Sequence, residues 1–200
     1  KYYSGHQQIS DQREEYLELN NRYAEDLIVD VLSNDLHVLQ DGVMLEVRSD
    51  LRVENQNERK LDTLIFSLNP GFSVDSIISN DGSVEFVRTK QLILVLPEEG
   101  IAASEEKEFT LFYKGEPDEA VAYLDIRKKN LEALKYIQVA TIDKKPGIVD
   151  ENFLLLTPEL LWYPISGVGF NLKTFLPSEL DFTRFSLSVE LDTNMTAIAP

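Results

Sequence analysis

DGVMLEVRSDLRV, residues 41–53, carries the clearest structural signal in this chain. From Val43 to Val47 apolar residues occupy every second position, and the pattern continues at Val53, which is the period of a strand with one face in a core. Gly42 allows the positive φ angle that a tight hairpin needs. The stretch therefore predicts a hairpin that leads into a long, half-buried β-strand.

Similar segments lie on both sides of this stretch, from Asp26 to Tyr113, and turn signals separate them about every 8–12 residues. The turns Asn69-Pro70-Gly71 and Asn80-Asp81-Gly82 are typical of such separators. The expected strands cover residues 61–68, 74–79, 84–88, 92–96 and 107–113. No helix of normal length fits between them, which argues against a fold of alternating strands and helices. The predicted fold class is all-β, an antiparallel β-sandwich.

A short N-terminal helix is expected before the first strand, from about Asp11 to Ala24. Asp11 can cap its N-terminus, and Glu14 stands where a capping box places a carboxylate. An apolar stripe at helical spacing follows, formed by Tyr16, Leu19 and Tyr23. We expect residues 1–25 to form a leader helix that packs on the sandwich or bridges to whatever precedes it, and residues 26–200 to form the sandwich.

The second half of the chain is less regular. Residues 117–149 are interpreted as an irregular insertion with some helical character, ending in a turn at residues 144–147. A short buried strand is expected at residues 153–156, and Pro158 can start a turn or short helix. A last strand is expected from Phe182 to Leu191. Its apolar residues share one face: Phe185, Leu187, Val189 and Leu191.

The charge of the chain limits its partners. With 19 basic and 35 acidic residues, the formal net charge is −16. Nucleic acid is therefore not an expected partner, because phosphate binding needs a concentrated basic surface, and an anionic membrane surface is disfavoured for the same reason. An acidic surface maintains solubility, and it also attracts cationic substrates or partners.

Residues suited to catalysis or metal binding are scarce. Cysteine is absent, which excludes disulfides and thiolate chemistry but leaves the compartment open. The two histidines, His6 and His37, are far apart and neither is followed by Glu. Acidic pairs such as Glu98-Glu99 flank turns, where carboxylates are solvated. We therefore expect no catalytic residue and no metal site in this chain.

Six short motifs occur in an order that is informative as a series. They lie at residues 41–47, 64–70, 92–97, 112–115, 162–164 and 185–200. The fourth ends in Tyr113-Lys114-Gly115, and the fifth is Trp162-Tyr163-Pro164. This series resembles the N-terminal domain of the aminopeptidase N family of zinc metallopeptidases. It covers most of the chain after Asp26, and only the order of the motifs is specific.

The resemblance implies a saddle-like β-sandwich that precedes a catalytic domain. This chain alone would then be no enzyme, and zinc is expected only in that downstream catalytic domain, which would be its partner. The domain would dock there and wall the substrate cleft, with Trp162, Tyr163 and Pro164 near the junction. In some members a Gln or Glu of this domain holds the free amino group of the substrate. The nearest approximation here is Glu151, although the sequence motif that surrounds this residue in the family is absent.

A second resemblance leaves another function open. Leu160-Leu161-Trp162-Tyr163-Pro164 followed by a glycine-rich loop looks like bacterial members joined to an ABC-type permease. The chain would then be a ligand-binding or scaffolding sandwich of a membrane-associated transporter protein, without peptidase activity, with permease membrane segments as partners. The extracytoplasmic side is favoured in that case. The sequence leaves open whether Trp162 and Tyr163 line a cleft or seal a domain edge.

Overall fold

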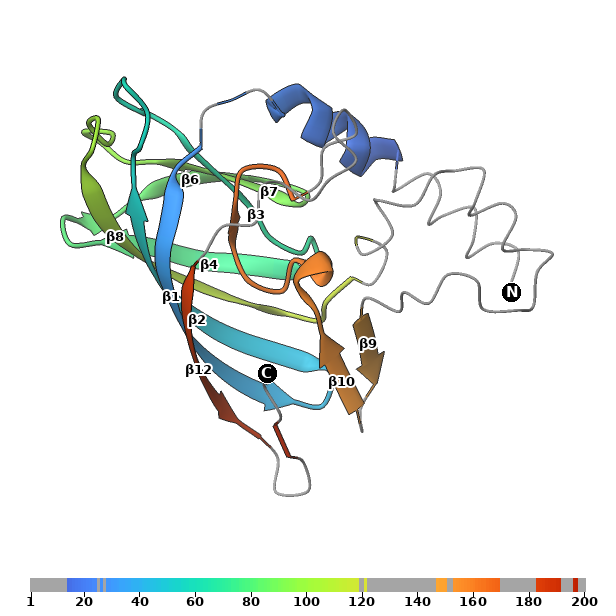
Figure 1. Cartoon of the computed structure of the whole chain (residues 1–200). Coiled ribbons are helices and arrows are strands. Elements are labelled where there is room, and N and C mark those ends of the chain that lie inside the picture. Colours follow the sequence, from blue (N-terminus) through green and yellow to red (C-terminus); the bar gives the residue numbers. More distant parts are fainter. Residues whose placement is uncertain are drawn as a thin grey trace.

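The computed structural model describes residues 14–24, 26, 28–118, 121, 147–150, 153–169, 183–191 and 196–197. Two β-sheets pack face to face, a two-stranded hairpin covers one end, and one helix lies on the outside (Figure 1). The predicted all-β sandwich with a short helix is confirmed. No helix among the described residues is long and apolar enough to cross a membrane.

The larger sheet has six strands in the order β12-β1-β2-β8-β4-β5. Its strands are β1 (Asp30–Asp41), β2 (Met44–Glu54), β4 (Phe72–Ser79), β5 (Gly82–Ser83), β8 (Glu106–Gly115) and β12 (Arg184–Glu190). All neighbours are antiparallel except β1 and β12, which are parallel. The expectation of an antiparallel sheet therefore misses one pair. A parallel pair needs a long connection, and almost the whole chain separates these two strands.

The smaller sheet has four strands in the order β11-β3-β7-β6. Its members are β3 (Leu64–Ser67), β6 (Glu85–Thr89), β7 (Leu92–Leu96) and β11 (Ile165–Ser166). The hairpin consists of β9 (Gly147–Asp150) and β10 (Phe153–Leu156), and the short 3₁₀ helix η2 (Pro158–Leu160) follows it. Gly147, expected in a turn, instead begins β9. The strand at residues 153–156 is half-buried rather than buried, because only one of its faces meets the core.

The main core fills the space between the two sheets. Every second residue of β2 and β8 points into it, and the largest fully buried side chains include Tyr113, Phe66, Phe109, Leu45, Leu51 and Ile93. Leu154 and Leu156 of β10 pack against the same core from one end. The alternating apolar residues that predicted a strand at residues 41–53 are therefore the ones on the inner face of the larger sheet.

Two glycines serve the larger sheet in different ways, one through a positive φ angle and the other through a close approach of two backbones. Gly42 joins β1 to β2 with a φ angle of 59°, as the hairpin prediction requires. At the end of β8, a Cβ on Gly115 would lie 2.2 Å from the backbone oxygen of Gly71. The glycine at the end of the Tyr113-Lys114-Gly115 motif therefore allows β4 and β8 to approach closely.

The N-terminal helix occupies residues 14–23 of the described chain. It lies above β3 and β7 in Figure 1, on the face of the smaller sheet that points away from the main core. Tyr16 and Leu19 of the predicted stripe are buried and Tyr23 is half-buried, so the stripe is confirmed. The proposed cap Asp11 lies outside the described residues.

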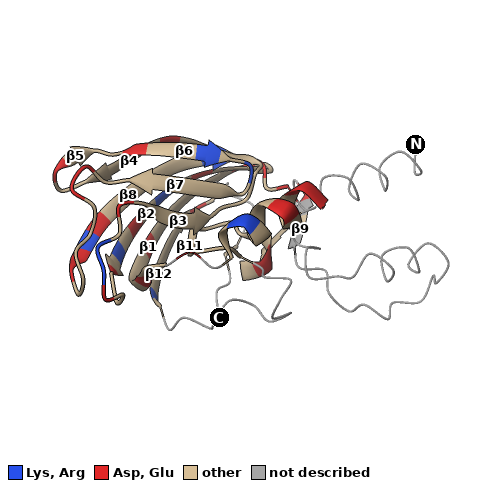
Figure 2. Ribbon diagram, turned by 90° about the horizontal axis from the view of Figure 1, so that it is seen from above, with Lys and Arg blue, Asp and Glu red and all other residues tan. Residues whose placement is uncertain are grey.

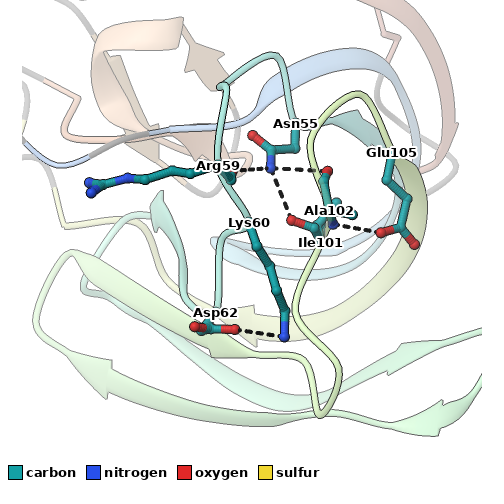
Figure 3. Close-up of polar contacts among 7 residues, drawn as sticks. All are labelled: Asn55, Arg59, Lys60, Asp62, Ile101, Ala102 and Glu105. Carbon is teal, nitrogen blue, oxygen red and sulfur yellow. Dashed lines mark hydrogen bonds and ion pairs between the residues drawn. The ribbon is translucent and has the colours of Figure 1, made fainter.

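A fully buried amide, Asn55, ties two long loops together at one end of the sandwich (Figure 3). Its Nδ2 donates to the carbonyl oxygens of Arg59 (2.9 Å), Ile101 (2.9 Å) and Ala102 (3.1 Å). The backbones of Leu61 and Ile101 exchange a pair of hydrogen bonds beside it. The loop after β2 is thereby fixed to the loop before β8.

Candidate functional site

The segment Trp162-Tyr163-Pro164 lies between η2 and β11, where the chain crosses from the hairpin to the smaller sheet. Leu161 turns the chain there with a φ angle of 53°. Trp162 is only 8% exposed and belongs to the main core, and Pro164 is also buried. Tyr163 alone is half-buried. The Trp162 indole is therefore not a surface group, and Tyr163 is the member of this segment that reaches the solvent.

Asn69, which is fully buried after β3, holds the start of this segment in place. Its Nδ2 donates to the carbonyl oxygens of Leu160 (2.7 Å) and Asp118 (3.0 Å). Its Oδ1 accepts from the backbone N–H groups of Gly71 (2.9 Å) and Asp118 (2.7 Å). Its own backbone N–H donates to the carbonyl of Leu161 at 2.7 Å. One side chain thus joins three separate loops.

A second buried group holds the Trp162 backbone. The hydroxyl of Tyr113, on β8, donates to the Trp162 carbonyl oxygen at 3.1 Å. Burial raises the pKa of Tyr113 well above its ordinary value, so the hydroxyl keeps the proton that makes this bond. The segment is therefore fixed to both sheets, to β3 through Asn69 and to β8 through Tyr113.

A row of aromatic rings leads from the core to the edge of the larger sheet. The Trp162 and Tyr163 ring centroids are 5.1 Å apart, and those of Tyr163 and Phe185 are 5.0 Å apart, both in edge-to-face geometry. Phe185 and Leu187 of β12 are 48% and 41% exposed. We call Tyr163, Phe185 and Leu187 the aromatic border.

The residues of the aromatic border that lie on β12 belong to the same face of the larger sheet as the main core, but they are exposed to solvent. In the parallel register Leu187 pairs with Leu36 of β1, whose side chain is buried in the core. Paired residues on neighbouring strands share a face, so the apolar residues of β12 share one face, as predicted, and the structure turns that face inward. It is exposed because neither the smaller sheet nor the described part of the hairpin extends over it.

The tyrosine of the aromatic border stays protonated at neutral pH. Burial, and then the negative charge of Glu159, raise the pKa of Tyr163 above its ordinary value. Its hydroxyl can donate a hydrogen bond and its ring can contact apolar surface. The aromatic border therefore offers binding contacts and contains no nucleophile and no base for neutral pH.

The structure brings together no metal ligands among the residues it describes. His37 lies on the outer face of β1, with Arg48 and Ser188 as its cross-strand partners, and His6 lies outside the described residues. These surroundings do not fit a zinc site, because zinc needs three or four N, O or S ligands around one point.

The remaining sequence-predicted residues contribute little to a site. Glu151 lies outside the described residues, so its role as an amine contact stays a prediction. Glu98 and Glu99 are exposed in a turn. Glu105 accepts from the Ala102 N–H at 2.6 Å, which gives this carboxylate a structural part in the loop.

One feature of the surface was not foreseen from the sequence. The outer face of the larger sheet holds an open depression of about 340 Å³, lined by His37, Leu39, Glu46, Arg48, Phe112 and Glu190 among others. Acidic and basic residues are interspersed over the sheets (Figure 2). Ion pairs Arg48–Asp50 (3.0 Å) and Lys114–Asp75 (3.0 Å) lie on this face. The outward positions of alternating strands were the only sequence signal for it.

Comparison with known proteins supports the fold and no closer relationship. No protein-family model matches the chain, and no curated protein sequence matches it. An M1 zinc metallopeptidase from Deinococcus radiodurans has a similar structure, at 20% sequence identity and a TM-score of 0.53, over 82% of this chain and 33% of that one. A variant of the Deinococcus radiodurans enzyme bound to a Tyr-Ser-Ala substrate matches at 20% identity, with a TM-score of 0.50, over 82% of this chain and 32% of that one.

A third similar structure is described as a two-domain M1 zinc metallopeptidase, in a variant bound to L-arginine. It is 19% identical, with a TM-score of 0.50, and the match covers 82% of this chain and 33% of that one. The chain thus spans about a third of the length of the solved proteins that it matches. What the comparisons show is that this chain shares its fold with a part of these zinc metallopeptidases.

Proposed function

We propose that this chain is the non-catalytic N-terminal domain of an aminopeptidase N-like zinc metallopeptidase. It docks on a catalytic domain that follows it and walls one side of the substrate cleft. The observation that carries this proposal is the aromatic border, an apolar edge that no described element covers, beside the hydrogen-bonded segment Trp162-Tyr163-Pro164. The likeness to a third of several zinc metallopeptidase chains supports it.

The aromatic border suits a surface that another domain covers. Exposed apolar side chains that lie side by side mark interaction sites more often than scattered ones, and aromatic residues are enriched at interfaces. Asn69 and Tyr113 hold the neighbouring backbone by buried hydrogen bonds. A surface that is fixed before docking loses little conformational entropy when the partner arrives.

The role of the domain in the proposed peptidase is steric and electrostatic. In this proposal the catalytic zinc and its ligands belong to the following domain. A chain with a net charge of −16 attracts the free ammonium group of a peptide substrate. The wall would restrict access to small peptides and concentrate cationic ends near the cleft.

The proposal is tested on a longer stretch of the parent protein that includes the next domain. We expect bound zinc at one equivalent and cleavage of aminoacyl-nitroanilides. Tyr163→Ser combined with Phe185→Ser should lower turnover about tenfold or more, which corresponds to roughly 1.4 kcal/mol. The control is Val87→Ser on β6, since Val87 is also 48% exposed but lies away from the aromatic border. Equal turnover in both variants would contradict the docking role.

A second candidate belongs to a different class. The depression on the outer face of the larger sheet favours a ligand-binding or scaffolding sandwich in an ABC-transporter-associated membrane protein without peptidase activity. The same longer protein decides between the two. A folded protein with neither zinc nor turnover, and a next domain without His-Glu-x-x-His, supports the scaffold.

A further inference from the structure

We propose that the helix of residues 14–23 is a separable strap that sets the conformation of the Trp162-Tyr163-Pro164 segment. While the helix is docked on the smaller sheet, residues 160–168 are held in the arrangement described above. When the helix leaves the sheet, that segment loosens while the larger sheet stays folded. This coupling does not depend on the proposed peptidase role, because both ends of it lie within this chain.

Apolar contacts join the helix to both ends of the segment. Tyr16 and Leu17 form a small cluster with Leu161, with Ile165 packed against it. Leu19 belongs to another cluster, together with Ile65, Leu92 and Val168. Both clusters are distinct from the main core, which contains Trp162. The helix therefore touches the residues that flank Trp162-Tyr163-Pro164, and it does so outside the core that stabilises the sandwich.

A chain of polar contacts runs along the same path. The Tyr16 hydroxyl donates to the Asp118 carboxylate at 3.2 Å. The backbone of Asp118 exchanges hydrogen bonds with the Asn69 side chain, which in turn donates to the Leu160 carbonyl oxygen at 2.7 Å. Movement of the helix thus displaces a partner of the amide that fixes the start of the segment.

A buried glutamine latches the helix to the turn between β6 and β7. Gln91 is fully buried, and its Nε2 donates to the Tyr16 carbonyl oxygen (2.7 Å) and to Asn20 Oδ1 (2.9 Å). At the rim Lys90 forms an ion pair with Glu15. These hydrogen bonds can form in only one position of the helix, so the helix docks in a defined register.

The surface beneath the helix nevertheless contains buried polar atoms whose hydrogen-bonding capacity is not used, which makes the strap separable. Arg88 Nη1 and Gln91 Oε1 are buried without a hydrogen-bond partner in the part of the chain that the structure describes. Burial lowers the pKa of Arg88 to about 10. Burial, followed by Asp118, raises the pKa of Tyr16 to about 12, and nearby Arg88 opposes that shift. Undocking returns these polar groups to water. The free energy gained by their hydration offsets part of the free energy lost when the apolar contacts of the helix are broken.

The described part of the helix, residues 14–23, is short, which favours a cooperative transition. A helix of about ten residues has little stability in water without tertiary contacts. Undocking and unwinding should therefore occur together, as local unfolding of one unit. The docked and undocked states are then two discrete arrangements, and any segment that pulls on the helix shifts the population between them.

Trp162 provides the readout, because it is the only tryptophan of the 200-residue chain. Leu19→Asp removes the centre of one cluster and should undock the helix. We expect a red-shifted Trp162 emission, greater quenching by acrylamide, and amide exchange of residues 160–168 at least about tenfold faster. Exchange in β2 and β8 should stay slow. The matched control is Glu18→Asp, at an exposed position next to Leu19, which should change none of these signals.

A milder variant, Tyr16→Phe, removes only the hydrogen bond to Asp118 and should change the same signals in the same direction by a smaller amount. Fast exchange of helix amides in Leu19→Asp with unchanged residues 160–168 would overturn the coupling. Fast exchange in β2 and β8 together with the helix, in both variants, would also overturn it, because the helix would then be part of the core rather than a strap.

Discussion

Replacing Asn69 by alanine is expected to lower the free energy of unfolding by about 3–5 kcal/mol. The side chain makes four hydrogen bonds within 3.0 Å, two donated by Nδ2 and two accepted by Oδ1. Alanine leaves the buried carbonyl of Leu160 and the N–H of Asp118 without these partners. Each buried polar group left unsatisfied costs about 1–3 kcal/mol, and the small cavity adds to that loss.

Urea unfolding followed by Trp162 fluorescence measures this effect. The midpoint should fall while the slope against urea stays the same, because the surface exposed on unfolding does not change. Asn80→Ala, at an exposed asparagine in the turn after β4, is the control and should stay within about 0.5 kcal/mol of the parent. A loss below about 1 kcal/mol in Asn69→Ala would show that water replaces the amide.

Replacing Asn55 by alanine should cost about 2–4 kcal/mol, for a related reason at the other end of the sandwich. The Asn55 Nδ2 satisfies three carbonyl oxygens that face each other across two loops (Figure 3). Its Oδ1 accepts from the N–H of Asn57 at 3.0 Å. Without the amide the carbonyl oxygens of Ile101 and Ala102 face an apolar methyl group, and the loops keep their backbone hydrogen bonds but lose the side-chain link.

Thermal unfolding and amide exchange separate this effect from a general loss of packing. The Leu61 and Ile101 amides, whose mutual hydrogen bonds lie beside Asn55, should exchange faster by a larger factor than those in the middle of β2. Gln56→Ala, at the exposed neighbouring residue, should leave both unchanged. A uniform acceleration of amide exchange over the whole larger sheet in Asn55→Ala would contradict a local role for the Asn55 side chain.

The strands could be predicted from the sequence because their signal is local. Val43 to Val53 alternate with the period of one buried face, and β2 covers all of that stretch except Val43. The turns at Gly42 and Gly82 contain glycines with positive φ angles. Each of these features depends on neighbouring residues only, so one sequence suffices to read it.

The pairing of strands that are far apart in the sequence could not be predicted in the same way. The strand at residues 184–190 was expected, but its parallel pairing with β1 depends on how the chain between them folds. Alternation shows which residues of a strand share a face. It does not show whether another element covers that face, and the exposure of Phe185 and Leu187 therefore appeared only in the structure.

The role of the candidate site stays a prediction, and its geometry was not accessible from the sequence. Trp162-Tyr163-Pro164 was expected near a junction, and the structure divides its members between the core and the surface. The buried amides of Asn55 and Asn69 were missed, because asparagine in a loop usually indicates a turn or a cap. What distinguishes these two is burial among carbonyl groups from distant segments, which no local pattern contains.

The most direct test of the account compares amide hydrogen exchange in this chain alone with exchange in a longer protein that carries the following domain. If that domain docks on the aromatic border, exchange at Tyr163 and in residues 185–187 should slow by about tenfold or more. Residues of β6 around Val87 should be unaffected. Unchanged exchange at the aromatic border, or protection confined to the outer face of the larger sheet, would contradict the proposed docking and favour the ligand-binding sandwich.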